Sequence, residues 1–116
     1  MKYYKELLLK KLSDDGWELT TQDDETDWWL EEYWIIKSVK QSYGYTLHVL
    51  FLVDPMYDGN KKSQAVWAIA AAETLPANRP INDECLVEMD LQKGKFDIKL
   101  NTFVEEINEQ RSKKNL

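Results

Sequence analysis

Two neighbouring stretches of alternating residues constrain the fold of this chain more than any other feature. Residues 30–42 alternate between two sets of side chains, and both sets are apolar at the start and more polar toward the end. Residues 45–53 carry large apolar side chains at every second position, and Leu50 and Leu52 add apolar character to the other face. Residues 41–44 between them are typical of a hairpin turn. The two stretches therefore predict an antiparallel pair of β-strands, buried most fully near the end of the second strand.

Periodicity also predicts the elements on either side of this hairpin. Apolar residues recur at helical spacing over 2–14 and over about 96–111, which predicts two amphipathic helices. Gly16 is placed to end the first helix in the left-handed conformation. Shorter alternating stretches predict strands over 17–21 and 85–91.

Residues 65–74 are consistent with either a helix or a strand. Five alanines, with Ser63 as an N-cap, favour a helix. Val66, Trp67 and Ile69, following a polar loop, favour a strand. We favour the strand because it extends the preceding hairpin into a meander.

The predicted order is helix, about five strands, helix, with no repeat and no linker. We therefore expect residues 1–116 to form a single α+β domain: an antiparallel sheet of about five strands flanked by N- and C-terminal helices packed on one face. Because only those helices are available to cover the sheet, we expect its other face to be partly open. A chain of 116 residues buries enough surface to fold without a disulfide or a metal ion.

Charge and composition argue against several classes of function. The net charge of -6 argues against binding nucleic acid by neutralising phosphates. The basic residues near the C-terminus suit the negative end of the last helix; they are Arg111, Lys113 and Lys114. No apolar run approaches the ~20 residues of a membrane helix, and the N-terminal pattern is not that of a secretory signal. Cys85 is the only cysteine, which excludes an internal disulfide and fits a reducing compartment. We expect a cytoplasmic protein with no nucleic-acid or membrane partner.

The negative charge is concentrated in one segment of the chain. Residues 13–32 include nine acidic residues and no Lys or Arg, whereas residues 1–12 carry a net charge of +3 and residues 33–116 are neutral. Four of the five tryptophans lie in or beside the acidic segment, namely Trp17, Trp28, Trp29 and Trp34.

This coincidence of charge and tryptophan predicts a surface for a basic protein partner. Trp28 and Trp29 are adjacent, so on a strand they point to opposite faces, and we expect one of them to be partly exposed. A tryptophan anchor with an acidic rim suits a basic partner because complementary charge raises the association rate. The residues predicted to bind the partner are Asp23, Asp24, Glu25, Asp27, Trp28, Trp29 and Glu31. The first hypothesis is a small acidic binding protein without enzymatic activity.

Two alternative functions remain open at this point. One is a homodimer, comparable to a chaperone, that uses the open face of the sheet. The other is a small-ligand-binding domain with a pocket between the sheet and the helices, lined by Tyr33, Trp34, His48 and Asp54.

No motif in the sequence indicates a catalytic site. Cys85 occupies an alternating strand position, where cysteine usually acts as a small buried apolar residue and not as a nucleophile paired with His48. Asp54 and Asp58 flank one loop and are the least implausible carboxylate pair, but turn chemistry accounts for both. We therefore expect no catalytic residues.

Metal and cofactor sites are not predicted either. An EF-hand loop that begins at Asp23 would need Gly and Glu at the positions that Trp28 and Trp34 occupy. One cysteine and one histidine cannot supply the usual zinc ligands, and the four glycines are isolated, so no phosphate-binding loop is present.

The size and acidity of the chain are similar to those of small bacterial immunity or inhibitor proteins that block basic nucleases. The helix–sheet–helix order also resembles that of type III secretion chaperones, which are small, acidic and dimeric. Both are resemblances of composition and layout without matching motifs, so no residue role is carried over from either family.

Overall fold

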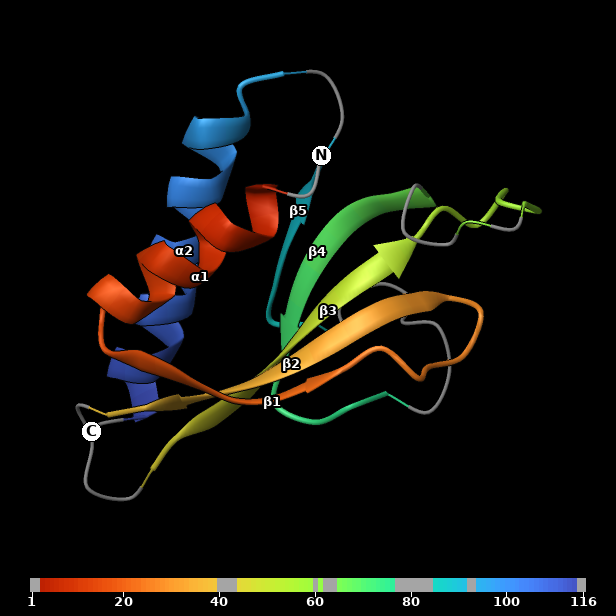
Figure 1. Ribbon diagram of the computed structural model, residues 1–116. Helices are drawn as coiled ribbons and strands as arrows, with labels where there is room; N and C mark the ends of the chain where they lie inside the picture. The colour runs from red at the N-terminus through yellow and green to blue at the C-terminus, as the bar shows by residue number, and fades with distance from the viewer. Residues whose placement is uncertain are drawn as a thin grey trace.

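The computed structural model describes residues 3–39, 44–59, 61, 65–76, 85–91 and 94–114. One sheet carries two helices on the same side (Figure 1). In chain order the elements are α1 (Tyr3–Asp14), β1 (Trp17–Asp23), β2 (Leu30–Ser38), β3 (Thr46–Val53), β4 (Val66–Ala72), β5 (Val87–Asp90) and α2 (Phe96–Lys114).

The sheet is an antiparallel meander with the strand order β1-β2-β3-β4-β5. The predicted α+β fold with two terminal helices is therefore confirmed. The strand predicted over 65–74 is confirmed as β4, which pairs with β3 on one side and β5 on the other. As a central strand it packs apolar side chains on both faces of the sheet, with Ile69 and Ala71 on one face and its other alanines on the opposite face, and this packing outweighs the helical preference of the alanines.

The element boundaries differ from the predictions at strand ends and at the end of α2, which runs to Lys114, beyond the predicted end near residue 111. Gly16 follows α1 with a φ of 87°, the left-handed conformation expected of it. β1 continues to Asp23, beyond the predicted end of the strand at residue 21, and β5 begins at Val87, after Cys85. Of the predicted turn at 41–44, only Gly44 belongs to the described residues, and its φ of 67° is also left-handed.

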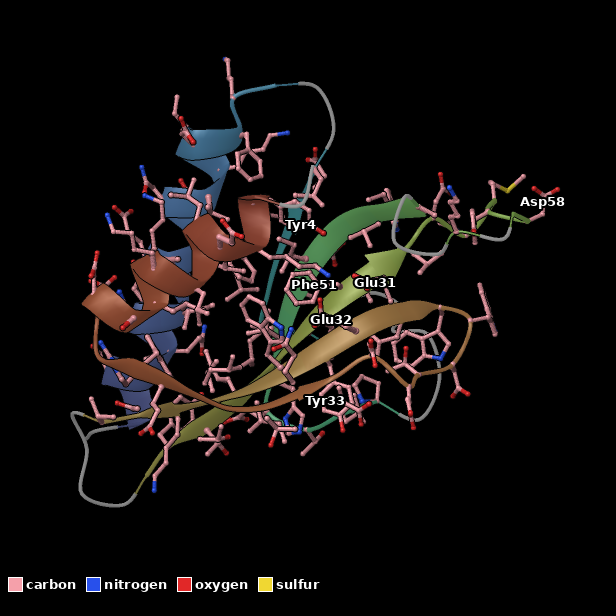
Figure 2. All side chains as sticks on the ribbon, in the orientation of Figure 1. Tyr4, Glu31, Glu32, Tyr33, Phe51 and Asp58 are labelled. Carbon is pink, nitrogen blue, oxygen red and sulfur yellow. The ribbon has the colours of Figure 1, made fainter. Side chains whose placement is uncertain are left out.

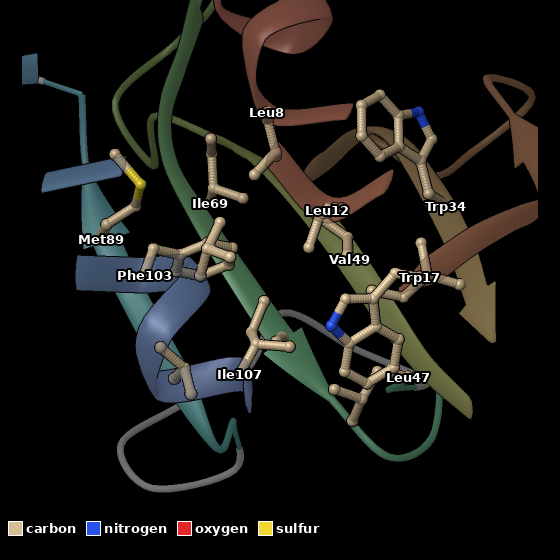
Figure 3. Close-up of a cluster of buried hydrophobic side chains, with 14 of the residues drawn as sticks. Leu8, Leu12, Trp17, Trp34, Leu47, Val49, Ile69, Met89, Phe103 and Ile107 are labelled. Atoms are coloured by element: carbon tan, nitrogen blue, oxygen red, sulfur yellow. The ribbon is translucent and has the colours of Figure 1, made fainter. Parts of the chain in front are cut away.

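The larger core lies between the sheet and the two helices (Figure 3). Leu8 and Leu12 are one helical turn apart on α1, and Phe103 and Ile107 are one turn apart on α2. All four are at most 1% exposed and pack in one cluster with the inward residues of β2, β3 and β4, such as Val49. The apolar stripe of each helix therefore covers the same face of the sheet.

The second face of the sheet is buried at its centre, and only its margins are exposed, for example at Lys37 and Glu88. Its central residues, Leu50, Leu52, Ala68, Ala70 and Ala72, are at most 4% exposed. Trp29 and Leu30 belong to the same cluster, and Trp67 packs against it. The expected partly open face is therefore confined to the margins of the sheet. The burial of the centre was not predicted, because only helices were counted as cover, whereas large side chains next to strands can also bury a sheet face.

A bulge at the start of β2 places two glutamates beside α1. The register of β2 against β3 shifts between Leu30 and Glu32, so the strand has one extra residue there. Neighbouring strand residues normally point to opposite faces. Here Glu31 and Glu32 both form salt bridges with Lys5 of α1.

This Lys5 contact fastens α1 to the sheet. The Lys5 ammonium also lies 4.6 Å from the centre of the Phe51 ring. Glu32 is 5% exposed, and its second oxygen accepts hydrogen bonds from Gln22 (3.0 Å) and from the Trp34 indole (3.2 Å). Figure 2 shows the two glutamates with Phe51 between α1 and the sheet. The buried carboxylate is therefore well satisfied.

Arg111 lies near the C-terminal end of α2, as predicted, but it is buried, which the prediction did not include. It is 8% exposed, its guanidinium lies 4.8 Å from the Trp17 ring, and it donates a 3.4 Å hydrogen bond to Ser38. Trp17 in turn donates to Asn108 (2.9 Å). The burial of Arg111 was not predicted, because position along a helix does not show which side of α2 meets the β1–β2 hairpin. There the flat guanidinium stacks on the indole of Trp17.

Candidate partner-binding site

The acidic loop between β1 and β2 borders a pocket of about 360 Å³. The chain leaves β4 and runs beneath the sheet toward this loop, so residues far apart in sequence meet there (Figure 1). The pocket is lined by Asp23, Glu25, Thr26, Asp27, Trp29, Leu30, Tyr33, Leu75 and Pro76. Its wall therefore combines three carboxylates with two aromatic side chains and an apolar floor, which suits a cation with an apolar stem.

Hydrogen bonds within the loop order its backbone and hold the Asp23 carboxylate. The Glu25 amide donates to the Asp23 side chain (2.9 Å), and the Leu30 amide donates to the Asp27 carbonyl (3.1 Å). The Thr26 hydroxyl donates to the Leu30 carbonyl. Because the loop is already ordered, a ligand would lose little free energy in arranging it.

The two adjacent tryptophans have opposite environments, as the sequence predicted. Trp28 is 61% exposed, whereas Trp29 is 4% exposed and packs in the cluster on the second face. The Trp29 carbonyl accepts a hydrogen bond from the Val53 amide (2.9 Å), which ties the loop to the end of β3. Trp29 thus anchors the loop, and Trp28 is free of the core. Leu75, on the pocket wall, adds a further apolar side chain at 41% exposure.

Tyr33 connects the pocket to the second face of the sheet. Figure 2 shows it on the side opposite Tyr4 and Phe51. Its hydroxyl donates to Asp23 (3.3 Å), and partial burial, the charge of Asp23 and this hydrogen bond raise the pKa of Tyr33 above its usual 10.0. Tyr33 therefore stays protonated at neutral pH and orients the carboxylate.

His48 lies beside Tyr33, with 6.1 Å between the ring centres. Its Nδ1 is buried and has no hydrogen-bond partner in the structure. Burial lowers the pKa of His48 from 6.5, and a hydrogen bond with the backbone of Glu73 acts in the opposite direction. His48 is therefore neutral near pH 7 and does not offset the negative charge of the pocket.

Of the residues predicted to bind a partner, the structure brings Asp23, Glu25, Asp27 and Trp29 together in the pocket. Asp24 and Trp28 are exposed on the same loop. Glu31 lies elsewhere, because the β2 bulge turns it toward Lys5. Burial and charge at that contact also raise the pKa of Tyr4 above its usual range.

The residues of the alternative ligand pocket are not gathered around one cavity. Tyr33 and His48 share the second face, but Trp34 is 2% exposed on the helix side, with its ring centre 4.9 Å from that of Phe51. The Asp54 side chain accepts a hydrogen bond from the Met56 amide (2.9 Å), which is turn geometry.

Sequence reasoning missed part of the pocket wall. Thr26, Leu75 and Pro76 were not singled out, and Tyr33 was assigned to a different pocket. Thr26 could have been noticed as the only hydroxyl residue within the acidic run 23–27. Nothing in the sequence indicates that residues after β4 return to the β1–β2 loop, since this contact depends on the path of the chain.

The described residues contain no cluster of metal-binding side chains and no helix that could cross a bilayer. No group of three His, Cys, Asp or Glu side chains in the described ranges could hold a metal ion. Within the same ranges, neither helix is long and apolar enough to span a bilayer. Cys85 is half-buried and packs against the second-face cluster.

Comparison with protein-family models, with curated proteins and with solved structures finds no match to this chain. The function is therefore inferred from the residues and geometry of the pocket.

Proposed function

We propose that this protein is a small acidic binding protein, without enzymatic activity, that holds a basic protein partner at the β1–β2 loop. A lysine or arginine side chain of the partner enters the pocket, where carboxylates neutralise its charge and the side chains of Tyr33 and Leu75 contact its stem. The observation that carries the proposal is the pocket itself, in which three carboxylates meet two aromatic side chains.

The exposed side chains around the pocket support the same proposal. Trp28 is 61% exposed beside the pocket residues, and large aromatic side chains are the residues that most often dominate binding at protein interfaces. The acidic rim accelerates encounter with a basic protein and makes the complex sensitive to salt. An inhibitor or immunity protein that blocks a basic enzyme is one kind of protein with this surface.

Titration with a capped tripeptide that has a central arginine tests the proposal, with tryptophan fluorescence as the readout at low ionic strength. We expect saturable binding that salt weakens, and no binding of the matched citrulline peptide, which has the same shape without the charge. In the variant Asp23→Asn/Glu25→Gln/Asp27→Asn, we expect affinity to fall about tenfold or more, since each charged contact contributes about 1.5 kcal/mol or more.

The matched control removes the same charge from another part of the surface. Glu18, Glu105 and Glu109 are exposed and lie outside the pocket. The variant Glu18→Gln/Glu105→Gln/Glu109→Gln should bind the arginine peptide almost as the parent does. Equal losses in the two triple variants would mean that only net charge matters, and the pocket would then have no role.

A further inference from the structure

A second surface lies at the opposite edge of the sheet, along β5. Among the described strands, β5 pairs with β4 alone. The Leu91 amide donates to the Trp67 carbonyl (2.8 Å), in the same register as the β4–β5 pairs. Because hydrogen bonding alternates along an antiparallel strand, Met89 also bonds toward β4, and Glu88 directs its backbone N–H and C=O toward the outer edge.

A pocket of about 240 Å³ runs along this edge, between β5 and α2. It touches Glu88, Met89 and Asp90, three consecutive residues whose side chains alternate in direction. A pocket that touches all three must therefore follow the edge of the strand and not one face of the sheet. Met89 and Phe103 form its apolar floor.

The other wall of this groove is one stripe of α2, which runs back beside β5 (Figure 1). Ile98, Thr102 and Glu106 stand one turn apart along that stripe. Ile98 is 64% exposed, which is unusual for a large apolar side chain. The stripe is about 12 Å long at the helical rise, and β5 is about 10 Å long at the strand rise, so the two walls match in length.

We propose that this groove binds an extended basic segment of a partner protein, which adds to the sheet as a further strand beside β5. The segment pairs with the outward backbone groups of Glu88 and inserts an apolar side chain between Ile98 and the Met89–Phe103 floor. Strand addition supplies affinity through backbone hydrogen bonds and specificity through alternate side-chain pockets. The site is separate from the β1–β2 loop, so it does not depend on the function proposed above.

Charge determines which occupant fits the groove. Asp90 forms a 2.6 Å salt bridge with Lys99, and the carboxylates of Glu88 and Glu106 also line the groove, which is therefore net negative. Pairing β5 with β5 of a second copy would bring like charges opposite one another, which is destabilising. A segment in which basic and apolar residues alternate satisfies both the carboxylates and the apolar floor.

A short capped peptide in which lysine and valine alternate, labelled with fluorescein, is the probe. We expect the full chain to bind it, and to bind neither the peptide with glutamate in place of lysine nor the peptide with N-methylated backbone amides. The N-methylated peptide keeps all charges and side chains but cannot pair as a strand. Equal binding of the N-methylated and unmodified peptides would overturn the proposal.

Two substitutions assign the binding to the groove. Glu88→Pro removes an outward N–H without breaking a hydrogen bond to β4. Affinity for the peptide should fall about tenfold or more relative to the control Glu88→Gln, which removes only the charge. Ile98→Lys should abolish binding, whereas Val39→Lys, at a residue of similar exposure (61%), should not. Circular dichroism checks that each variant is folded.

Three results would contradict the proposal. The first is unchanged affinity for the peptide in both Glu88→Pro and Ile98→Lys, and the second is an equal loss of that affinity in Ile98→Lys and Val39→Lys. The third is a dimer in sedimentation analysis that Glu88→Pro dissociates, because the occupant of the groove would then be a second copy of the chain. The triple variant of the β1–β2 loop should keep its affinity for the lysine–valine peptide. Failure at one surface is therefore distinguishable from failure at the other.

Discussion

At the scale of single residues, the pair Trp28 and Trp29 shows how one residue type serves two roles at adjacent positions. The backbone turn before β2 sends Trp29 into the second-face cluster and leaves Trp28 in solvent. A buried indole contributes mainly to folding, whereas an exposed one contributes only when a partner covers it. Substitution of Trp29 is therefore expected to affect stability, and substitution of Trp28 is expected to affect binding.

Trp29→Ala should lower the free energy of unfolding by about 3–5 kcal/mol, because it removes a large side chain from a packed cluster. Trp28→Ala should change the free energy of unfolding by less than about 0.5 kcal/mol, as expected of a surface substitution. It should nevertheless weaken binding of a basic protein at the loop. Urea denaturation of both variants measures the difference. Similar stability losses would show that Trp28 is part of the core and not an anchor for a partner.

At the scale of elements, the β2 bulge couples a strand to a helix. Without the extra residue, Glu31 and Glu32 would point to opposite faces, and Lys5 could meet only one of them. The bulge therefore creates the contact that holds the first turns of α1 against the sheet. Removing the lysine charge leaves two largely buried carboxylates without their cation.

Lys5→Met keeps the stem over Phe51 and removes the charge, so we expect a loss of about 3 kcal/mol in unfolding free energy, in the range of a broken buried pair. Lys10→Met is the control, because Lys10 is exposed on the same helix, and it should change stability by less than about 0.5 kcal/mol. Adding Glu32→Gln to Lys5→Met should restore part of the loss. Equal stability of the two single variants would show that the Lys5 salt bridges contribute nothing.

At the scale of the whole molecule, His48 makes stability depend on pH. Burial lowers its pKa in the folded chain below the ordinary 6.5, so the unfolded chain takes up a proton that the folded chain resists. Above about pH 7.5 both forms are neutral and His48 has no effect. As the pH falls through 6.5, stability declines until the folded form is also protonated.

We therefore expect wild-type protein to be less stable near pH 5.5 than near pH 7.5, and the variant His48→Gln to lose less over the same interval. Urea denaturation at the two pH values gives the comparison, and the variant corrects for carboxylates that begin to titrate. Because His48 is the only histidine, proton NMR can follow its titration directly. A midpoint at or above 6.5 would contradict the prediction.

The candidate site was predictable in part. The acidic loop and the split between Trp28 and Trp29 follow from local sequence, since they depend on adjacent residues and on charge. The pocket wall at Leu75 and Pro76 and the diversion of Glu31 to Lys5 do not, because a bulge and a chain path are set by contacts between distant segments. The same reason explains why the burial of Arg111 was not predicted.

The sequence by itself determined the two terminal helices, the meander of strands and the concentration of acid and tryptophan near β1 and β2. These follow from periodicities of 3.6 and 2 residues, turn residues and local charge, all of which act over a few positions. Only the tertiary structure decided that the centre of the second sheet face is buried, that the acidic loop borders a pocket, and that β5 and α2 form a groove. Each of these depends on surfaces that come together only when the whole sheet has folded.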